Sequence, residues 1–274
     1  MTTHAATESI RVQPMAKPPM REDLKLAAWL GLAAALAALA LMPYVMLTMP
    51  DAMAKAQAKM HVPLAVLLAF QSVQAFVLLA LFSFVGLRLG HSVGLGAPWL
   101  RALLTGAKRQ SQPWLPAMLC GVLAAVAVLA LDPLFAPYMP KPVQALPATS
   151  AQVHAFAGFL ASFYGGIVEE LELRLFFVTL LAWLFYLASG KNRRPWQALV
   201  AVVLAAIAFG AGHLPAASQV WPLDAVVVTR TVLLNAIAGL VFGWFYVRNG
   251  LESAMLSHFC ADLVLHVAAP LVTA

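Results

Sequence analysis

Seven long apolar segments make up most of the chain and limit the folds that it can adopt. They lie at 24–48, 62–86, 113–132, 151–188, 196–214, 225–247 and 251–272. A helix needs about 20 apolar residues to cross the hydrocarbon core of a bilayer, and only helices and closed barrels satisfy their own backbone groups there. The sequence therefore predicts an all-α, polytopic transmembrane helix bundle. Because the fourth segment is unusually long and contains the pair Gly165–Gly166, we expect either seven or eight helices.

The composition points to the same class of protein. Of the 274 residues, 62% are hydrophobic and 10% are charged, whereas a soluble domain carries about 25% charged residues. We therefore expect an integral, multi-pass protein of the lipid bilayer, located in the plasma (inner) membrane if the source is bacterial. The net charge of +6 does not indicate a nucleic-acid partner, because the basic residues are dispersed over the ends of the apolar segments.

The positions of the basic residues indicate the topology. They fall into three groups: Arg11, Lys17, Arg21 and Lys25; Arg88, Arg101, Lys108 and Arg109; Lys191, Arg193 and Arg194. If segment 151–188 crosses the membrane once, all three groups lie on one side, as the positive-inside rule requires of the cytoplasmic side. We therefore expect a cytoplasmic N-terminus, with Gly165–Gly166 forming a kink or a re-entrant break within a single crossing.

Three regions follow from this pattern. Residues 1–23 are polar and proline-containing, which predicts a disordered tail rather than a cleavable signal peptide, so that the first apolar segment serves as an uncleaved anchor. Residues 24–150 form N-terminal transmembrane helices, and residues 151–270 form a second transmembrane domain. The two cysteines, Cys120 and Cys260, both lie inside apolar segments, which excludes a disulfide framework and a cysteine-based zinc site.

The fourth segment carries charges that are unfavourable in a membrane. Glu169, Glu170, Glu172 and Arg174 lie within six residues, and a charge near the bilayer centre costs at least about 2.5–3.5 kcal/mol. Glu170 and Arg174 are separated by four residues, so they share one helix face and can form an ion pair. Glu169 lies about 100° around the helix and needs another partner, while Glu172 can line a wet cavity.

Two later segments offer such partners. The sequence FGAGH places His213 near the end of the fifth segment, and Glu169 and His213 each lie 22 residues from Lys191. If a tight loop at Lys191 joins two antiparallel helices, Glu169 and His213 lie at nearly the same depth. In the last segment, His258, Asp262 and His266 recur every four residues as a polar stripe. The depth of His258 relative to Glu169 does not follow from the sequence.

These motifs resemble those of the CPBP family, the CAAX prenyl protease and bacteriocin-processing (Abi) proteins. EELELR at 169–174, FGAGH at 209–213 and HFCAD at 258–262 match EExxxR, FxxxH and a late HxxxN or HxxxD on consecutive membrane helices. The glycine-spaced sequence before the third motif, GLVFGWFYVRNGLESAMLSH, is also similar to that family, and its Gly239 and Gly243 suit close helix packing. The likeness covers about residues 151–270. Family members commonly have Asn where this chain has Asp262.

The resemblance implies an intramembrane endopeptidase of the CPBP type, acting on a peptide or a membrane protein. It also implies roles for individual residues, and peptide hydrolysis needs such roles: an activated water, a proton carrier and a group that stabilises the oxyanion. Glu169 and His213 would activate water, whereas His258 and Asp262 would orient the scissile carbonyl and stabilise the oxyanion.

Two further points follow from the same resemblance. Glu170 and Arg174 would form a structural pair that anchors the helix. An alternative mechanism makes Glu169, His213 and His258 ligands of a catalytic zinc ion. Because HExxH is absent, no local spacing argues for a metal, and we favour direct activation of water, with zinc as a possible cofactor.

Other functions and roles stay open at this stage. A non-catalytic relative could serve as a bacteriocin-immunity or scaffolding protein of the same fold, and a proton-coupled transporter could use the same carboxylates as a relay. No internal repeat supports transport. We expect His61, His154 and His266 to be packing residues, and Arg230, near Asp224, to extend to the membrane interface.

Overall fold

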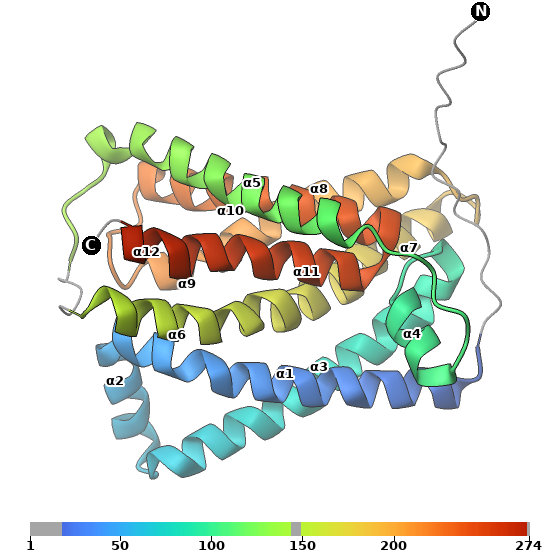
Figure 1. Cartoon of the computed structure of the whole chain (residues 1–274), viewed down its shortest axis with the longest axis horizontal. Helices are drawn as coiled ribbons and strands as arrows, with labels where there is room; N and C mark the ends of the chain where they lie inside the picture. Colours follow the sequence, from blue (N-terminus) through green and yellow to red (C-terminus); the bar gives the residue numbers. More distant parts are fainter. Residues whose placement is uncertain (1–17, 144–148, 273–274) are drawn as a thin grey trace, which may run out of the picture.

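The computed structural model describes residues 18–143 and 149–272, and these residues form helices joined by short connections, without a strand. The long helices run roughly side by side (Figure 1). Seven of them are long and apolar enough to cross a membrane: Met20–Thr48, Leu64–Val93, Trp114–Leu134, Ala151–Ala188, Pro195–Ala217, Ala225–Asn249 and Leu251–Val272. The predicted all-α polytopic bundle is therefore confirmed, and its spans coincide with the seven apolar segments.

The helices have the following bounds. The α-helices are α1 (Met20–Thr48), α2 (Pro50–Met60), α3 (Leu64–Val93), α4 (Pro98–Thr105), α5 (Trp114–Leu131), α6 (Ala151–Phe163), α7 (Thr179–Ala188), α8 (Pro195–Gly212), α9 (Leu214–Ala217), α10 (Ala225–Asn249), α11 (Leu251–Asp262) and α12 (Ala269–Val272). Asp132–Leu134 and Ala136–Tyr138 are single 3₁₀ turns. Tyr164–Glu169, Leu171–Val178 and Leu263–Ala268 are π-helical.

The fourth span stays helical from Ala151 to Ala188 and crosses once. The bundle therefore has seven candidate spans rather than eight, and Gly165–Gly166 does not form a re-entrant break. Instead, both glycines lie in a π-helical stretch. π-Helical turns are uncommon and occur mostly at functional sites, and here they include most of the charged cluster.

The fourth span is the central element of the bundle. On one side α6 packs against α1, and the π-helical stretch Leu171–Val178 packs against α3; on the other side the span contacts α8 and α11. Figure 1 shows α6 lying between α1 and the red C-terminal helices, with α5 and α10 beyond them. The span thus joins the N-terminal helices to those that follow it.

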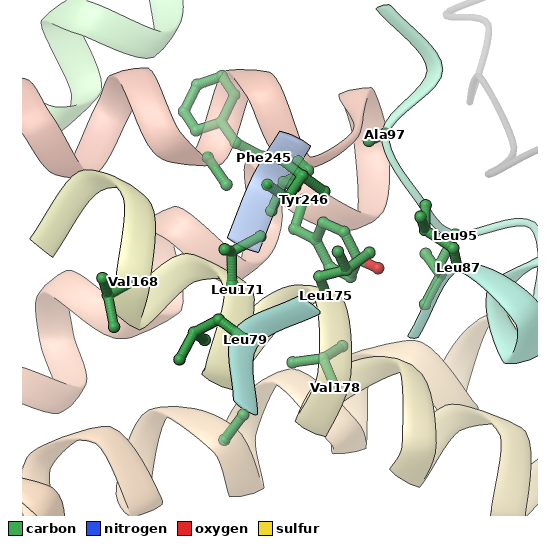
Figure 2. Packing of buried hydrophobic residues seen from close by; sticks show 14 of the residues in the cluster. Leu79, Leu87, Leu95, Ala97, Val168, Leu171, Leu175, Val178, Phe245 and Tyr246 are labelled. Carbon is green, nitrogen blue, oxygen red and sulfur yellow. The ribbon is translucent and has the colours of Figure 1, made fainter. Parts of the chain in front are cut away.

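Apolar residues of the fourth span form the main core. Figure 2 shows Leu171 and Leu175 of this span beside Tyr246 of α10, with Leu79 and Leu87 of α3 close by. All five side chains are almost completely buried. The face of the span that carries no charge therefore fixes its position between α3 and α10.

Small residues allow the helices around this core to approach closely. A Cβ atom on Gly243 would lie 2.6 Å from Val202, and one on Gly239 would lie 3.2 Å from Ala206. Both glycines are therefore packing residues, as predicted, but the helix that they pack against is α8 and not the last span. Similarly, a Cβ atom on Gly121 would lie 2.0 Å from the Ser257 carbonyl oxygen, which shows how closely α5 approaches α11. Such small-residue contacts are typical of membrane helices, where packing drives association.

A second buried charge cluster, which the sequence did not predict, holds α1, α3 and α4 together. Asp23 is fully buried at the start of α1. Its carboxylate accepts hydrogen bonds from Arg88 at 2.8 Å and from Arg101, and it contacts Nε2 of His91 at 3.1 Å. Three basic partners compensate the desolvation of this carboxylate.

The members of the three basic groups that the structure describes lie at one end of the bundle. With seven crossings, the start of α1, the connection from α3 to α5 and the connection from α7 to α8 all fall at the same end, on the right of Figure 1. The positive-inside rule then predicts that this end faces the cytoplasm. α1 begins at Met20, within the segment expected to be a tail; residues 1–17 lie outside the described residues.

Candidate active site

The site is built around a buried ion pair on the fourth span. Glu170 and Arg174 are 0% and 1% exposed, and the Nη1 atom of Arg174 lies 3.0 Å from Oε1 of Glu170. The Nη2 atom of Arg174 donates a hydrogen bond to the Gly239 carbonyl oxygen at 3.0 Å. The guanidinium group also lies over the rings of Phe209 and Phe242, 5.0 and 5.4 Å from their centroids. The predicted i,i+4 pair is therefore present, and it ties the fourth span to α8 and α10.

His258 of α11 connects this pair to the other carboxylates. Its Nδ1 atom lies 2.8 Å from Oε1 of Glu170, and its Nε2 atom lies 3.6 Å from both Oε2 of Glu169 and Oδ1 of Asp262. An ionised carboxylate only accepts hydrogen bonds, so Nδ1 carries the proton toward Glu170. The other nitrogen of His258, Nε2, then faces Glu169 and Asp262.

Aromatic rings fix the imidazole of His258. The ring of Phe242 stacks on it with centroids 4.3 Å apart and an interplanar angle of 17°, and Phe209 meets it edge-on at 5.5 Å. Phe209 also lies edge-on to His213, with centroids 4.8 Å apart. One phenyl ring thus contacts both histidines and Arg174, which brings His213 to the same cluster.

His213 is held by its own helix. It caps the C-terminus of α8, and its Nδ1 atom lies 2.8 Å from the Phe209 carbonyl oxygen. A carbonyl oxygen can only accept, so Nδ1 is the protonated nitrogen. In the neutral ring Nε2 then keeps its lone pair and can accept a proton.

The two neighbouring glutamates lie in different environments. The side chain of Glu170 is fully buried, whereas that of Glu169 is 21% exposed. Both contact the same imidazole, but only Glu169 is open to a surrounding medium. Glu170 is therefore suited to a fixed electrostatic role, whereas Glu169 is accessible from outside the protein.

Gly165 makes room for Asp262. A Cβ atom at position 165 would lie 2.1 Å from Oδ2 of Asp262 and 3.0 Å from Nε2 of His258. The backbone of Gly165 is helical, so the glycine is needed for this close approach and not for a turn. The sequence suggested that Gly165–Gly166 bends the chain; at Gly165 the structure shows a packing reason instead.

The structure brings the six predicted site residues into one cluster, by direct contacts for Glu169, Glu170, Arg174, His258 and Asp262 and through Phe209 for His213. The sequence could not give the depth of His258, and the offset between α11 and the fourth span makes it level with both glutamates. Glu172 is partly buried on the same span.

Three residues near this cluster were not assigned to it from the sequence. The hydroxyl of Tyr44 on α1 lies 3.2 Å from Nδ1 of His266, and His154 lies edge-on to the Tyr44 ring at 5.5 Å. His266 in turn approaches Asp262 at 4.0 Å. Tyr44 and His266 are 222 residues apart, and no local pattern links them.

The remaining polar residues singled out in the sequence lie elsewhere. His61 is exposed, and its Nδ1 atom lies 3.2 Å from the Lys59 carbonyl oxygen. Arg230 pairs with Asp132 at 2.5 Å and stacks over Trp221. Asp224 instead caps α10 through the Val227 amide.

The donor set does not fit a metal ion in this arrangement. Within residues 18–143 and 149–272, no group of three or more His, Cys, Asp or Glu side chains is arranged to hold one. The Nδ1 atoms of His213 and His258 are occupied by a carbonyl oxygen and by Glu170, as is usual for metal-bound histidines too, so only Nε2 of each ring could bind an ion. Glu169, His213 and His258, the ligands of the alternative zinc mechanism, are not brought together as such a group.

Glu170→Ala is expected to destabilise the protein, because it leaves Arg174 as an unpaired buried charge. Breaking a buried pair costs about 3–5 kcal/mol. Glu169→Gln keeps the shape of a partly exposed side chain and is expected to change the free energy of unfolding by less than about 1 kcal/mol. Thermal unfolding in detergent compares the two variants, and equal stability would contradict this division between the glutamates.

Gly165→Ala is expected to destabilise the protein by about 1–3 kcal/mol, as is typical of overpacking. The added methyl group would displace the buried carboxylate of Asp262. Gly212→Ala is the matched control, since a Cβ atom there meets nothing within 4 Å. Thermal unfolding measures both, and a neutral Gly165→Ala variant would show that the close approach is not needed.

Comparison with known proteins agrees with the motifs. Residues 151–264 match the model of a family described as "Type II CAAX prenyl endopeptidase Rce1-like". No curated protein and no solved structure gives a significant match to the chain. The matched segment contains all six residues of the cluster and lies within the region where the motifs resemble the CPBP family. Residues 151–264 are therefore similar to the Rce1-like family, as the motifs predicted, and this similarity supports an intramembrane protease of the CAAX prenyl endopeptidase type.

Proposed function

We propose that the protein is an intramembrane endopeptidase that hydrolyses a peptide bond near the membrane with water activated by Glu169 and His213. The observation that carries this proposal is the pair of unlike glutamates on one imidazole: Glu170 is sealed from the surroundings and Glu169 is 21% exposed. The buried carboxylate can hold the imidazole in place, while the exposed carboxylate is accessible to a water molecule.

Glu169 is the general base in this scheme. It takes a proton from a water molecule, whose oxygen then attacks the scissile carbonyl carbon. His213 assists through Nε2, because its Nδ1 atom is held by the Phe209 carbonyl oxygen. When the carbon–nitrogen bond breaks, the proton held by Glu169 passes to the leaving amine, and the products are a free amine and a carboxylic acid, which then releases its proton to the solvent.

His258 stabilises the oxyanion that forms after attack, and the carboxylate of Asp262, 3.6 Å from its Nε2 atom, helps to orient the imidazole. The ionised Glu170 accepts from Nδ1 of His258 at 2.8 Å and favours a protonated imidazole, whose Nε2–H then points toward the reaction. Stacking on Phe242 keeps the ring in that orientation. Donors fixed in advance, in a site shielded from water, are the largest single contribution to many enzymatic rates.

Glu170 and Arg174 hold the machinery in place rather than touching the substrate. Both are fully buried, and Arg174 binds the Gly239 carbonyl oxygen of α10. Their charges compensate each other, so Glu170 can accept from His258 without leaving a net charge in the membrane interior.

The substrate class follows from the family and the location of the site. A C-terminal peptide that carries a prenylated cysteine is the first choice, because the matched family is described as CAAX prenyl endopeptidase. Such a lipidated peptide partitions into the bilayer, where the partly exposed Glu169 lies.

Purified protein in lipid vesicles is expected to cleave a farnesylated CAAX-type peptide, with the products identified by mass spectrometry. Glu169→Gln is expected to lower turnover by about 10²–10⁴-fold, the usual contribution of a general base, and to leave the thermal unfolding unchanged. An unprenylated peptide of the same sequence shows whether the lipid is recognised. If folded wild-type protein cleaves neither peptide, a scaffolding or immunity role replaces the proposal; proton flux across the vesicles would favour a transporter.

Dialysis against a strong chelator is expected to leave this activity intact, because no step of the mechanism passes through a metal. Zinc analysis of the purified protein by mass spectrometry is the companion measurement. Loss of turnover on chelation, together with recovery when zinc is returned, would support the alternative mechanism, in which Glu169, His213 and His258 bind a catalytic zinc ion. The pH optimum does not separate the two mechanisms, since zinc lowers the pKa of bound water to about 7.

A further inference from the structure

Two residues outside the matched segment reach the proposed oxyanion site. Tyr44 lies on α1, and His266 lies in the π-helical stretch Leu263–Ala268, just beyond residue 264. The hydroxyl of Tyr44 and Nδ1 of His266 are 3.2 Å apart, and their ring centroids are 5.3 Å apart. Nε2 of His266 lies 4.0 Å from Oδ1 of Asp262. A line of polar groups therefore runs from α1 to Asp262.

The carboxylate of Asp262 is held from several sides. Its Oδ1 atom lies between two imidazole nitrogens, Nε2 of His258 at 3.6 Å and Nε2 of His266 at 4.0 Å. Its Oδ2 atom lies over Gly165, where no side chain intervenes. The ring of His266 thus lies within ion-pair distance of Asp262, although not within hydrogen-bond distance.

Nε2 is the nitrogen of His266 that faces Asp262. The hydrogen bond between Nδ1 and Tyr44 determines whether this Nε2 atom carries a proton. If Nδ1 accepts from the Tyr44 hydroxyl, the neutral ring carries its proton on Nε2. If Nδ1 donates to that hydroxyl instead, Nε2 of the neutral ring has only a lone pair, which is unfavourable beside a carboxylate. The arrangement with the Tyr44 hydroxyl as donor is therefore favoured, and it directs an N–H group toward Asp262.

The charges in the cluster show why Asp262 needs this partner. Arg174 is already paired with Glu170 at 3.0 Å. Asp262 is a further carboxylate, 7% exposed, and it shares His258 with Glu169 and Glu170. A carboxylate shielded from water requires a donor or a cation beside it, and Nε2 of His266, one helical turn later, lies 4.0 Å from this carboxylate.

Residues of α6 pack against the ring of Tyr44 and against the backbone of His266. A Cβ atom on Gly158 would lie 2.1 Å from the His266 carbonyl oxygen, so α6 packs directly on the backbone that carries this histidine. His154, one turn before Gly158 on α6, meets the Tyr44 ring edge-on at 5.5 Å. Figure 1 shows α6 between α1 and the C-terminal helices, which is the arrangement these contacts require.

We propose that Tyr44 and His266 are positioning residues for the proteolytic reaction: they hold the carboxylate of Asp262 against His258, so that α1 completes the active site of the Rce1-like domain. This inference rests on the proposed function. Neither residue touches the substrate, and each acts only through Asp262.

A double-mutant cycle tests this route. His266→Gln and Tyr44→Phe are each expected to lower kcat about tenfold and to change KM less than twofold, since a misplaced group lowers the rate and not the binding. In an Asp262→Asn background the carboxylate that His266 pairs with is gone, so the added His266→Gln change is expected to alter kcat less than twofold. His61→Gln, at an exposed histidine, is the matched control and is expected to retain full activity.

A spectroscopic readout keeps the test independent of turnover. The chain has 7 histidines, so the ring nitrogens can be assigned one by one by NMR in ¹⁵N-histidine-labelled protein. Tyr44→Phe and His266→Gln are expected to shift the resonances of His258, and His266→Gln in the Asp262→Asn background is expected not to shift them further.

The outcomes separate the two hypotheses. Equal loss of kcat from His266→Gln in both backgrounds, or unchanged His258 resonances in both single variants, overturns the positioning role. If wild-type protein cleaves no peptide but the His258 resonances shift as stated, the proposed function fails while the polar connection from α1 to His258 is upheld.

Discussion

The ion pair between Glu170 and Arg174 is the interaction on which the rest of the site depends. Both side chains are buried in a segment that crosses a membrane, where an unpaired charge is expensive. Within the pair, each charge compensates the other. The pair also contacts three other helices: Arg174 binds the backbone of α10 and lies over Phe209 of α8, while Glu170 binds His258 of α11. One pair of charges therefore positions three helices around the fourth span.

This arrangement lets adjacent residues perform different tasks. Glu170 faces the protein interior and Glu169 faces the partly open side, because successive residues of a helix point in different directions. His258 lies between them, with one nitrogen for each. The buried glutamate fixes the ring, and the exposed glutamate is left free for the chemistry that we propose. One glutamate is buried in an ion pair and its neighbour is partly exposed, which gives the two different carboxylates that the proposed mechanism uses.

Local sequence patterns predicted the membrane spans and most of the site residues. Contacts between helices that are distant in the sequence could not be predicted from such patterns. Apolar length gave the seven spans, and four-residue spacing gave the Glu170–Arg174 pair, since both depend on one helix alone. The contact between Glu169 and His258 depends on the offset between two helices, which spacing along either helix does not contain. The cluster around Asp23 was missed for the same reason. Its partners Arg88 and Arg101 lie on other helices, and in the sequence their positions indicate only the membrane topology.

The N-terminal helices, which the family match does not cover, are part of the same structural unit as the site. At one end of α1, Asp23 binds α3 and α4; at the other end, Tyr44 reaches His266. Between these two ends α1 packs against α6, and the following residues of the fourth span pack against α3. A helix held at both ends beside the fourth span restricts how that span can move relative to α11. Because Glu169 and Glu170 lie on the fourth span and His258 lies on α11, any such movement changes the distances between the groups that we assign to catalysis. The region of the chain without a family match therefore helps to set the geometry of the region that has one.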